Sequence, residues 1–114
     1  PAAYDAKLDL VYLPMGVTTP DIWGGNRTPE QERYASSILA LNATTGKLAW
    51  SYQTVHHDLW DMDLPAQPTL ADNTVNGQKV PVIYAPAKTI VVMANWWFRH
   101  RKNRFPKVQR KAIT

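Results

Sequence analysis

The chain has 114 residues, 45% of them hydrophobic, no cysteine and a formal net charge of +4. This length allows one domain at most, and the lack of cysteine excludes disulfides and thiolate metal sites. No apolar run approaches the roughly 20 residues of a membrane-spanning helix, and the start has neither an initiator methionine nor a signal-peptide pattern, so we expect a fragment of a longer protein.

The first predicted element is a buried strand over the apolar run Leu8 to Gly16, which a proline and a glycine end. The next stretch, 18–32, is dense in Pro, Gly, Asn and Asp and therefore predicts a loop. Thr28 followed by Pro29 predicts an N-cap and the first turn of a short helix within 28–38.

Two hairpins are predicted further along the chain. Residues 36–54 indicate a strand, a turn at Thr45-Gly46 and a second strand, because the glycine supplies the positive φ of a tight turn. Residues 67–89 repeat this pattern around Asn76-Gly77. Short strands at regular spacing favour an all-β sandwich, barrel or propeller. The side chains expected to form the core are Leu10, Tyr12, Ile38, Leu39, Leu48, Trp50, Val82 and Tyr84.

The stretch TVHHDLWDMDL, residues 54–64, holds two of the chain's three histidines together with three aspartates. A transition-metal site at His56, His57 and Asp58 is disfavoured, because adjacent residues of an extended chain point to opposite faces. We expect Asp58 and Asp63 to stabilise the loop, and His56 or His57 to orient it by hydrogen bonding.

The hairpin ALNATTGKLAW, residues 40–50, resembles the tryptophan-docking motif of eight-bladed quinoprotein propellers, Ala-x-Asp-x-x-Thr-Gly-x-x-x-Trp. Ala40, Thr45, Gly46 and Trp50 match this motif, whereas Asn42 replaces its usual aspartate. A physical account of the motif is that the glycine makes the turn and the indole packs flat against the neighbouring blade.

Three further blocks accompany the hairpin in one order: YLPMGVTTPDIWGGNR, YQTVHHDLWDMDLPAQPTL and VPVIYAPAKT. Together they make residues 1–89 similar to the membrane-bound glucose dehydrogenases of bacteria, those of enterobacteria in particular, that depend on pyrroloquinoline quinone (PQQ). The resemblance implies an all-β fold, with about one to one and a half blades of an eight-bladed quinoprotein propeller and one docking motif at 40–50.

The activity that this resemblance implies is oxidation of D-glucose, and of other aldoses, at C1 to the 1,5-lactone. Hydride passes to PQQ, and electrons then pass to ubiquinone at the periplasmic face of the bacterial inner membrane. The parent protein would reach the membrane through segments absent from this sequence. We expect the fragment by itself to be inactive.

The resemblance also assigns roles to particular residues. Asp61 matches the general base, a positioned carboxylate that takes the substrate hydroxyl proton. Lys88 matches the cation that reaches the quinone carbonyl, where positive charge stabilises a developing negative charge. Thr19 matches a residue that hydrogen-bonds the cofactor, although the adjacent Thr18 is equally capable. A divalent cation, Ca²⁺ or Mg²⁺, is implied as well, with protein ligands outside this fragment.

The last 25 residues, 90–114, differ from the rest in charge. Residues 1–89 carry six Lys or Arg against nine acids, a net charge of −3, whereas residues 90–114 carry seven Lys or Arg and no acid, a net charge of +7. One alternative is therefore a small basic binding module whose tail contacts nucleic acid. Another is a basic, aromatic segment that lies on a membrane surface.

A third interpretation, which we favour, is that residues 90–114 are unrelated to the family pattern because the gene is read in a shifted frame. The family-like sequence Gly-Glu-Leu-Val-Val-Pro, coded as GGC GAA CTG GTG GTT CCG, becomes Ala-Asn-Trp-Trp-Phe when read one nucleotide later. These are residues 94–98 in order. On this interpretation no nucleic-acid partner is expected.

Overall fold

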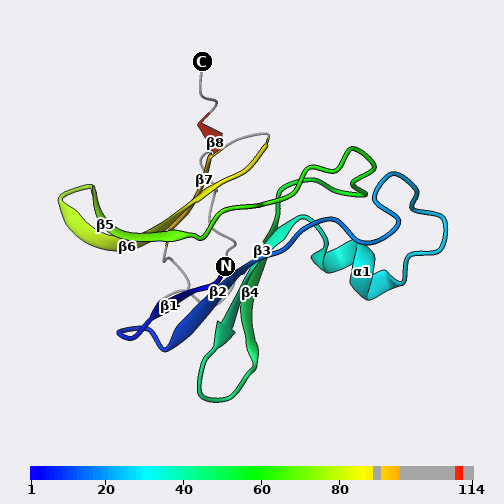
Figure 1. The fold of residues 1–114 in the computed structure, drawn as a ribbon. Coiled ribbons are helices and arrows are strands. Elements are labelled where there is room, and N and C mark those ends of the chain that lie inside the picture. The colour runs from blue at the N-terminus through cyan, green and yellow to red at the C-terminus, as the bar shows by residue number, and fades with distance from the viewer. Residues whose placement is uncertain (89–90, 96–109, 112–114) are drawn as a thin grey trace.

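The fold is built from two four-stranded antiparallel sheets, as Figure 1 shows. The computed structural model describes residues 1–88, 91–95 and 110–111. In each sheet the strands lie side by side in chain order, β1-β2-β3-β4 and β5-β6-β7-β8. Each sheet is thus a simple meander, and the predicted all-β class is confirmed.

The first sheet contains the predicted strand and the predicted docking hairpin. Tyr12 lies opposite Ala40, and Ala40 lies opposite Trp50, so the three residues form one row across the sheet. The ring centroids of Tyr12 and Trp50 are 5.8 Å apart. The strands are β1 (Ala3–Asp5), β2 (Leu10–Pro14), β3 (Ser37–Asn42) and β4 (Leu48–Gln53).

Asn42 organises the turn between β3 and β4. Its side-chain Oδ1 accepts hydrogen bonds from the backbone nitrogen of Thr45 at 2.8 Å and from the Thr45 hydroxyl at 2.9 Å. Gly46 follows at φ 71°, a conformation that glycine adopts at little cost. The Asn42 amide nitrogen donates to the Asp9 carboxylate at 3.1 Å, a bond that an aspartate could not make. The asparagine is therefore matched to the neighbouring acid.

The second sheet contains the other predicted hairpin, which turns at Asn76 and Gly77, both at positive φ. Its third strand pairs with β6 and lies beyond Thr89, the boundary expected from the sequence. The remainder of the basic tail, apart from β8, lies outside the described residues. The strands are β5 (Thr69–Val75), β6 (Gln78–Pro86), β7 (Val91–Asn95) and β8 (Arg110–Lys111).

One short helix, α1 (Pro29–Tyr34), lies within the described residues, where the sequence predicted it. The Thr28 hydroxyl accepts from the Gln31 backbone nitrogen at 3.2 Å, and the Gln31 side chain accepts from the Thr28 nitrogen at 2.8 Å. This reciprocal capping box satisfies two backbone donors that the helix leaves unpaired.

The core lies between the two sheets, and its predicted composition was partly wrong. Leu48 is 40% exposed, because a bulge in the β3–β4 pairing sets Leu48 opposite Leu41 and Trp50 opposite Ala40. An extra residue in one strand reverses the alternation of side chains. The core residues are Ala3, Leu10, Tyr12, Ile38, Ala40, Leu64, Ile83 and Ala85, with Trp50 and Tyr52 packed against them.

The second error in the predicted core concerns β6. Ile83 and Ala85 join the core cluster, whereas Tyr84 is only half-buried, since alternate residues of a strand point to opposite faces. Val82 is also buried, but it lies outside this cluster. Because β6 has apolar residues on both faces, the sequence alone does not show which face packs against the first sheet.

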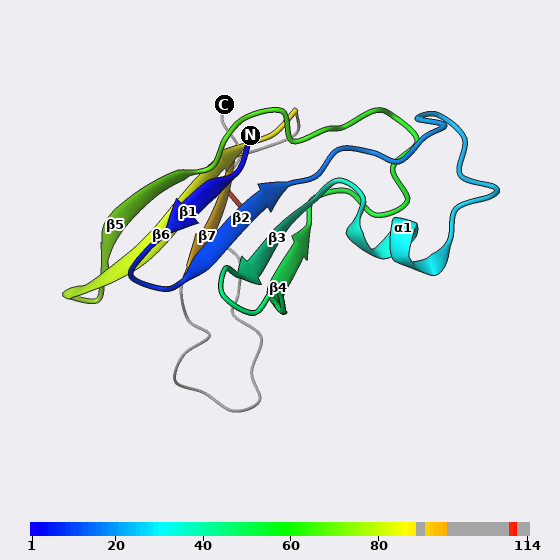
Figure 2. The same cartoon turned by 60° about the horizontal axis from the view of Figure 1, so that its bottom comes forward.

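The long connections gather at one end of the first sheet. Figure 2 shows that the loop after β2, helix α1 and the loop after β4 extend together from the end opposite the β3–β4 turn. No helix in the described part of the chain is long and apolar enough to cross a membrane. The strands of the first sheet thus hold these loops together at one end of the sheet.

The contact between Asn42 and Asp9 yields a prediction about stability. Asn42→Asp should destabilise the hairpin by about 1 kcal/mol, since it replaces a hydrogen bond with two facing carboxylates. Asp9→Asn in the same chain should restore most of the loss. Thermal unfolding of the full-length protein that carries this hairpin measures both effects. Equal stability of the single variant and the unchanged protein would contradict this account.

Candidate functional site

The loop 54–64 is organised by the carboxylate of Asp58, which is 1% exposed. It accepts hydrogen bonds from the backbone nitrogens of Trp60 and Met62, each at 2.9 Å. It also accepts one from the hydroxyl of Ser36 at 2.5 Å. A buried carboxylate is tolerated only when such donors replace water, so Asp58 and the loop around it stabilise each other, as the sequence predicted.

Ser36 connects this carboxylate to the first sheet. It is fully buried, at 0% exposure, and it adopts a positive φ of 46°. Its backbone nitrogen donates to the carbonyl of Gly16 at 2.9 Å. Its carbonyl accepts from the backbone nitrogen of Thr54 at 2.8 Å and from the Thr54 hydroxyl at 2.7 Å. Asp58 is therefore tied to the ends of β2, β3 and β4 at once.

Asp61, the sequence-predicted base, lies at the tip of this loop with a positive φ of 55°. Its Oδ2 lies 3.0 Å from the Nζ of Lys88, which also donates to the Asp61 backbone carbonyl. Both side chains are partly exposed, Asp61 at 46% and Lys88 at 45%. The structure thus brings together two predicted site residues that are 27 positions apart in the chain.

The charges of this pair affect each other's protonation. The hydrogen bond from Lys88, and then the neighbouring Asp63 side chain, lower the pKa of the Asp61 carboxyl. The bond to Asp61 raises the pKa of the Lys88 ammonium. Asp61 is therefore ionised at neutral pH and is in the state that can accept a proton.

Asp63 holds the far side of the loop against the segment that follows β2. Its Oδ1 accepts from the backbone nitrogen of Val17 at 2.8 Å. Gly16 leaves the space for it, because a Cβ there would lie 2.7 Å from the same oxygen. Its Oδ2 is 3.9 Å from the Lys88 Nζ. Asp63 thus has the loop-stabilising role that the sequence predicted and also adds negative charge beside Lys88.

Both histidines contact polar side chains on the opposite side of the loop. The Nδ1 of His56 lies 2.6 Å from Gln53 Oε1, and the Nδ1 of His57 lies 3.0 Å from Glu32 Oε1. Gln53 in turn donates to the carbonyl of Glu32 at 2.7 Å. In the described part of the chain, no group of three or more metal-ligating side chains is placed to hold an ion. His57 therefore joins the loop to α1, and His56 joins it to the end of β4.

Thr19 is exposed, and no hydrogen bond within the described residues joins it to Asp61 or Lys88. The adjacent Thr18 differs from it, because its hydroxyl is buried and has no partner among the described residues. A buried hydroxyl without a partner is unusual, and such a group can form a hydrogen bond with a ligand or a water molecule. Sequence reasoning treated the two threonines as equally capable, and burial is what distinguishes them.

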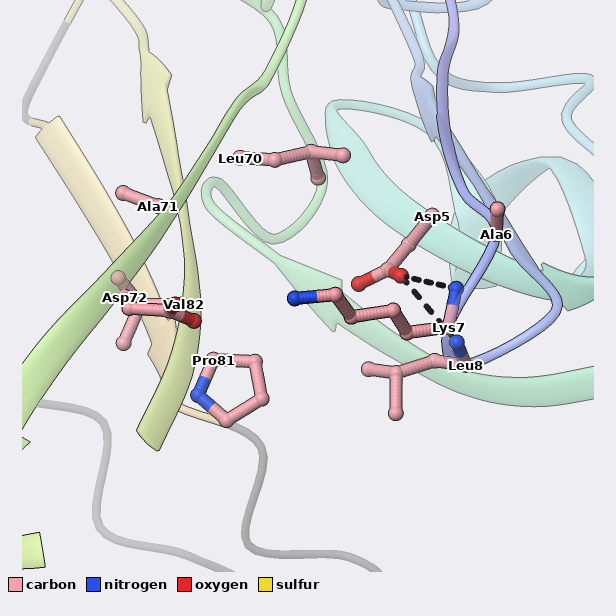
Figure 3. Close-up of a pocket in the computed structure, with 9 residues that line it drawn as sticks. All are labelled: Asp5, Ala6, Lys7, Leu8, Leu70, Ala71, Asp72, Pro81 and Val82. Atoms are coloured by element: carbon pink, nitrogen blue, oxygen red, sulfur yellow. Dashed lines mark hydrogen bonds between the residues drawn. The ribbon is translucent and has the colours of Figure 1, made fainter. Parts of the chain in front are cut away.

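An open groove of about 520 Å³ lies apart from these residues. Figure 3 shows the turn after β1, residues 5–8, on one side and residues of β5 and β6 on the other. Asp5 accepts hydrogen bonds from the backbone nitrogens of Lys7 and Leu8, so it serves the turn. The groove contains none of the predicted site residues.

Comparison with known proteins matches residues 1–93 to the family described as the PQQ glucose/ethanol/alcohol dehydrogenase β-propeller domain. The chain is 99% identical over 89 residues to quinoprotein glucose dehydrogenase of Escherichia coli K12, covering 78% of this chain and 11% of that protein. It is 67% identical over 90 residues to quinoprotein glucose dehydrogenase A of Acinetobacter calcoaceticus, again covering 78% of this chain and 11% of the relative.

A similar solved structure is the quinohemoprotein alcohol dehydrogenase of Comamonas testosteroni. It matches with a TM-score of 0.68 and 28% identity, over 83% of this chain and 14% of that one. The chain therefore spans about a tenth to a seventh of the length of these proteins.

Proposed function

The chain belongs to the PQQ-dependent glucose/ethanol/alcohol dehydrogenase family, and from this premise we propose that it forms part of a quinoprotein glucose dehydrogenase. The observation that carries the proposal is the contact between Asp61 and Lys88. The family resemblance gives these two residues complementary roles at one reaction centre, and they lie in the connections that follow β4 and β6, strands of different sheets. A carboxylate within hydrogen-bond reach of a substrate hydroxyl can accept its proton, and the Asp61 side chain is 46% exposed and so accessible to a substrate.

In the proposed reaction the C1 hydroxyl of glucose loses its proton to a carboxylate oxygen of Asp61. The C1–H bond breaks with its electron pair, and a C1=O bond forms, which gives the 1,5-lactone. PQQ supplies the hydride acceptor when bound, a chemistry that amino-acid side chains lack. Asp61 is already ionised at neutral pH, and the bond from Lys88 lowers the pKa of its carboxyl further.

The residues described here fit the cofactor in two respects. The Lys88 ammonium has three N–H donors, and Asp61 takes two of them through its carboxylate and its carbonyl. Among the described residues nothing accepts from the third, which can donate to an anionic oxygen of the cofactor. The Thr18 hydroxyl is a buried group without a partner in the described part of the chain, so Thr18 is a candidate cofactor contact beside Thr19.

The remaining parts of the proposal concern the whole protein. We propose that the substrates are D-glucose and other aldoses, and that the electron acceptor is ubiquinone. We also propose that the site lies at the periplasmic face of the inner membrane. The divalent cation, Ca²⁺ or Mg²⁺, takes its protein ligands from outside this chain. The support is the 99% identity over 89 residues to a quinoprotein glucose dehydrogenase.

The boundary at Thr89 also remains a proposal. We infer that residues 90–114 come from a shifted reading frame. The support is that the two glucose dehydrogenases align over only 89 and 90 of the 114 residues, and that the family match ends at residue 93. The nucleotide sequence around the Thr89 codon tests this directly. An insertion or deletion there is the expected result, and an uninterrupted frame shared with relatives would contradict the inference.

The roles of the pair predict distinct defects in the full-length, PQQ-loaded protein. Asp61→Asn should lower kcat by about 10²-fold or more and leave PQQ affinity nearly unchanged, because an amide cannot accept the proton. Lys88→Ala should lower both kcat and PQQ affinity. Dye-linked glucose oxidation and PQQ titration measure these effects. Asp72→Asn, an exposed position on β5, is the matched control, and near-normal turnover in Asp61→Asn would refute the base assignment.

Lys88→Ala should also change how kcat/KM depends on pH. Because Lys88 lowers the pKa of Asp61, the base stays ionised down to a lower pH than an ordinary aspartate. Lys88→Ala removes this effect, so the acid limb of its kcat/KM profile should move to higher pH. An unmoved limb would mean that Asp61 does not control it.

The chain by itself should have no dehydrogenase activity. Its two sheets are open, and repeat units generally need several stacked neighbours for stability. We therefore expect the purified 114-residue chain to bind neither PQQ nor glucose tightly. PQQ-dependent glucose oxidation by this chain alone would contradict the expectation.

A further inference from the structure

Asp58 is the most deeply buried charged side chain of the loop that carries Asp61, at 1% exposure. Its two carboxylate oxygens accept from the backbone nitrogens of Trp60 and Met62, the residues on either side of Asp61. One carboxylate thereby holds both neighbours of the proposed base. Because Asp58 is buried, it has no route to the substrate itself.

The backbone at Asp61 needs such support. Its φ of 55° lies in the left-handed region, which costs a non-glycine residue about 1 kcal/mol or more unless the surroundings impose it. The two hydrogen bonds to Asp58 impose it from inside the loop. The bond from Lys88 to the Asp61 carbonyl imposes it from the second sheet.

Ser36 makes this support rigid. Its hydroxyl donates to Asp58 Oδ2 at 2.5 Å, the same oxygen that accepts from the Met62 nitrogen. Ser36 is itself held through backbone bonds to Gly16 and Thr54, next to the ends of β2 and β4. The contact between Ser36 and Asp58 thus helps to fix the position of Asp61 relative to the strands of the first sheet.

From this geometry we propose that Asp58, together with Ser36, is a positioning residue for the base Asp61 and sets its orientation toward the substrate hydroxyl. The proposal rests on the function proposed above. Asp58→Asn is the informative change, because its amide keeps the shape of the side chain. Whichever way the amide is turned, however, its nitrogen faces a backbone N–H, of Trp60 or of Met62, that the carboxylate accepts from.

The test uses the full-length, PQQ-loaded protein. Asp58→Asn should lower kcat per PQQ-loaded site by about 10- to 100-fold, since small misplacements of a reacting group have effects of this size. KM for glucose and PQQ affinity should change less than about threefold, because neither ligand touches Asp58. The acid limb of kcat/KM should move to higher pH as Asp61 loses its alignment with Lys88 and Asp63, the charged groups that face it.

Ser36→Ala is the second variant, and it decides the matter if Asp58→Asn does not fold. It removes one donor to Asp58, so kcat should fall by about threefold to tenfold, with the same direction of shift in the acid limb. Asp72→Asn is the matched control and should leave all four quantities unchanged.

Two outcomes would overturn the proposal. One is a folded variant with unchanged kcat and pH profile. The other is a loss of activity that follows only the number of PQQ-loaded molecules, which would indicate a structural role. Asp61→Asn, assayed alongside, distinguishes a failure of the positioning role from a failure of the base assignment. If it is inactive while Asp58→Asn and Ser36→Ala are normal, the positioning role alone fails, whereas an active Asp61→Asn would refute the base assignment and this proposal with it.

Discussion

The buried carboxylate of Asp58 is the interaction on which the site depends. A charged group that leaves water must recover its hydrogen bonds inside the protein, and Asp58 recovers three, from Trp60, Met62 and Ser36. Hydrogen bonds to charged groups contribute about 1.5–3 kcal/mol each. They convert a polar segment of eleven residues into an ordered loop, whose tip presents Asp61 outside the core.

The contact between Asp61 and Lys88 also depends on how the second sheet packs against the first. Lys88 follows β6, whereas Asp61 follows β4, so the ion pair forms only when the two sheets pack face to face. The core that joins them combines residues of the first sheet, such as Tyr12 and Ile38, with Ile83 and Ala85 of the second. Apolar packing between sheets therefore sets the distance between the proposed base and its cation. The contact between Asp61 and Lys88 is therefore assembled from two successive sheets of the fold.

Local chemistry was readable from the sequence wherever one or two residues decide a conformation. Thr28 and Pro29 specify the start of α1, and Gly46 and Gly77 specify hairpin turns, because their conformational preferences act within a few residues. The core was harder to predict. A bulge beside Ala40 placed Leu48 on the face opposite to Trp50, and both faces of β6 carry apolar residues. Neither fact has a local signal, since each depends on which strand or sheet lies opposite.

The sequence by itself determined the all-β class and the hairpins, and motifs that resemble a quinoprotein family indicated Asp61, Lys88 and Thr19 as candidate site residues. Only the tertiary structure decided that Asp61 and Lys88 touch, that Asp58 supports the loop from within, and that Thr18 rather than Thr19 has the buried hydroxyl. The physical reason is the distance along the chain over which each interaction acts. Turn and capping preferences act between neighbours in the chain, whereas burial and ion pairing depend on segments that meet only when two sheets pack together.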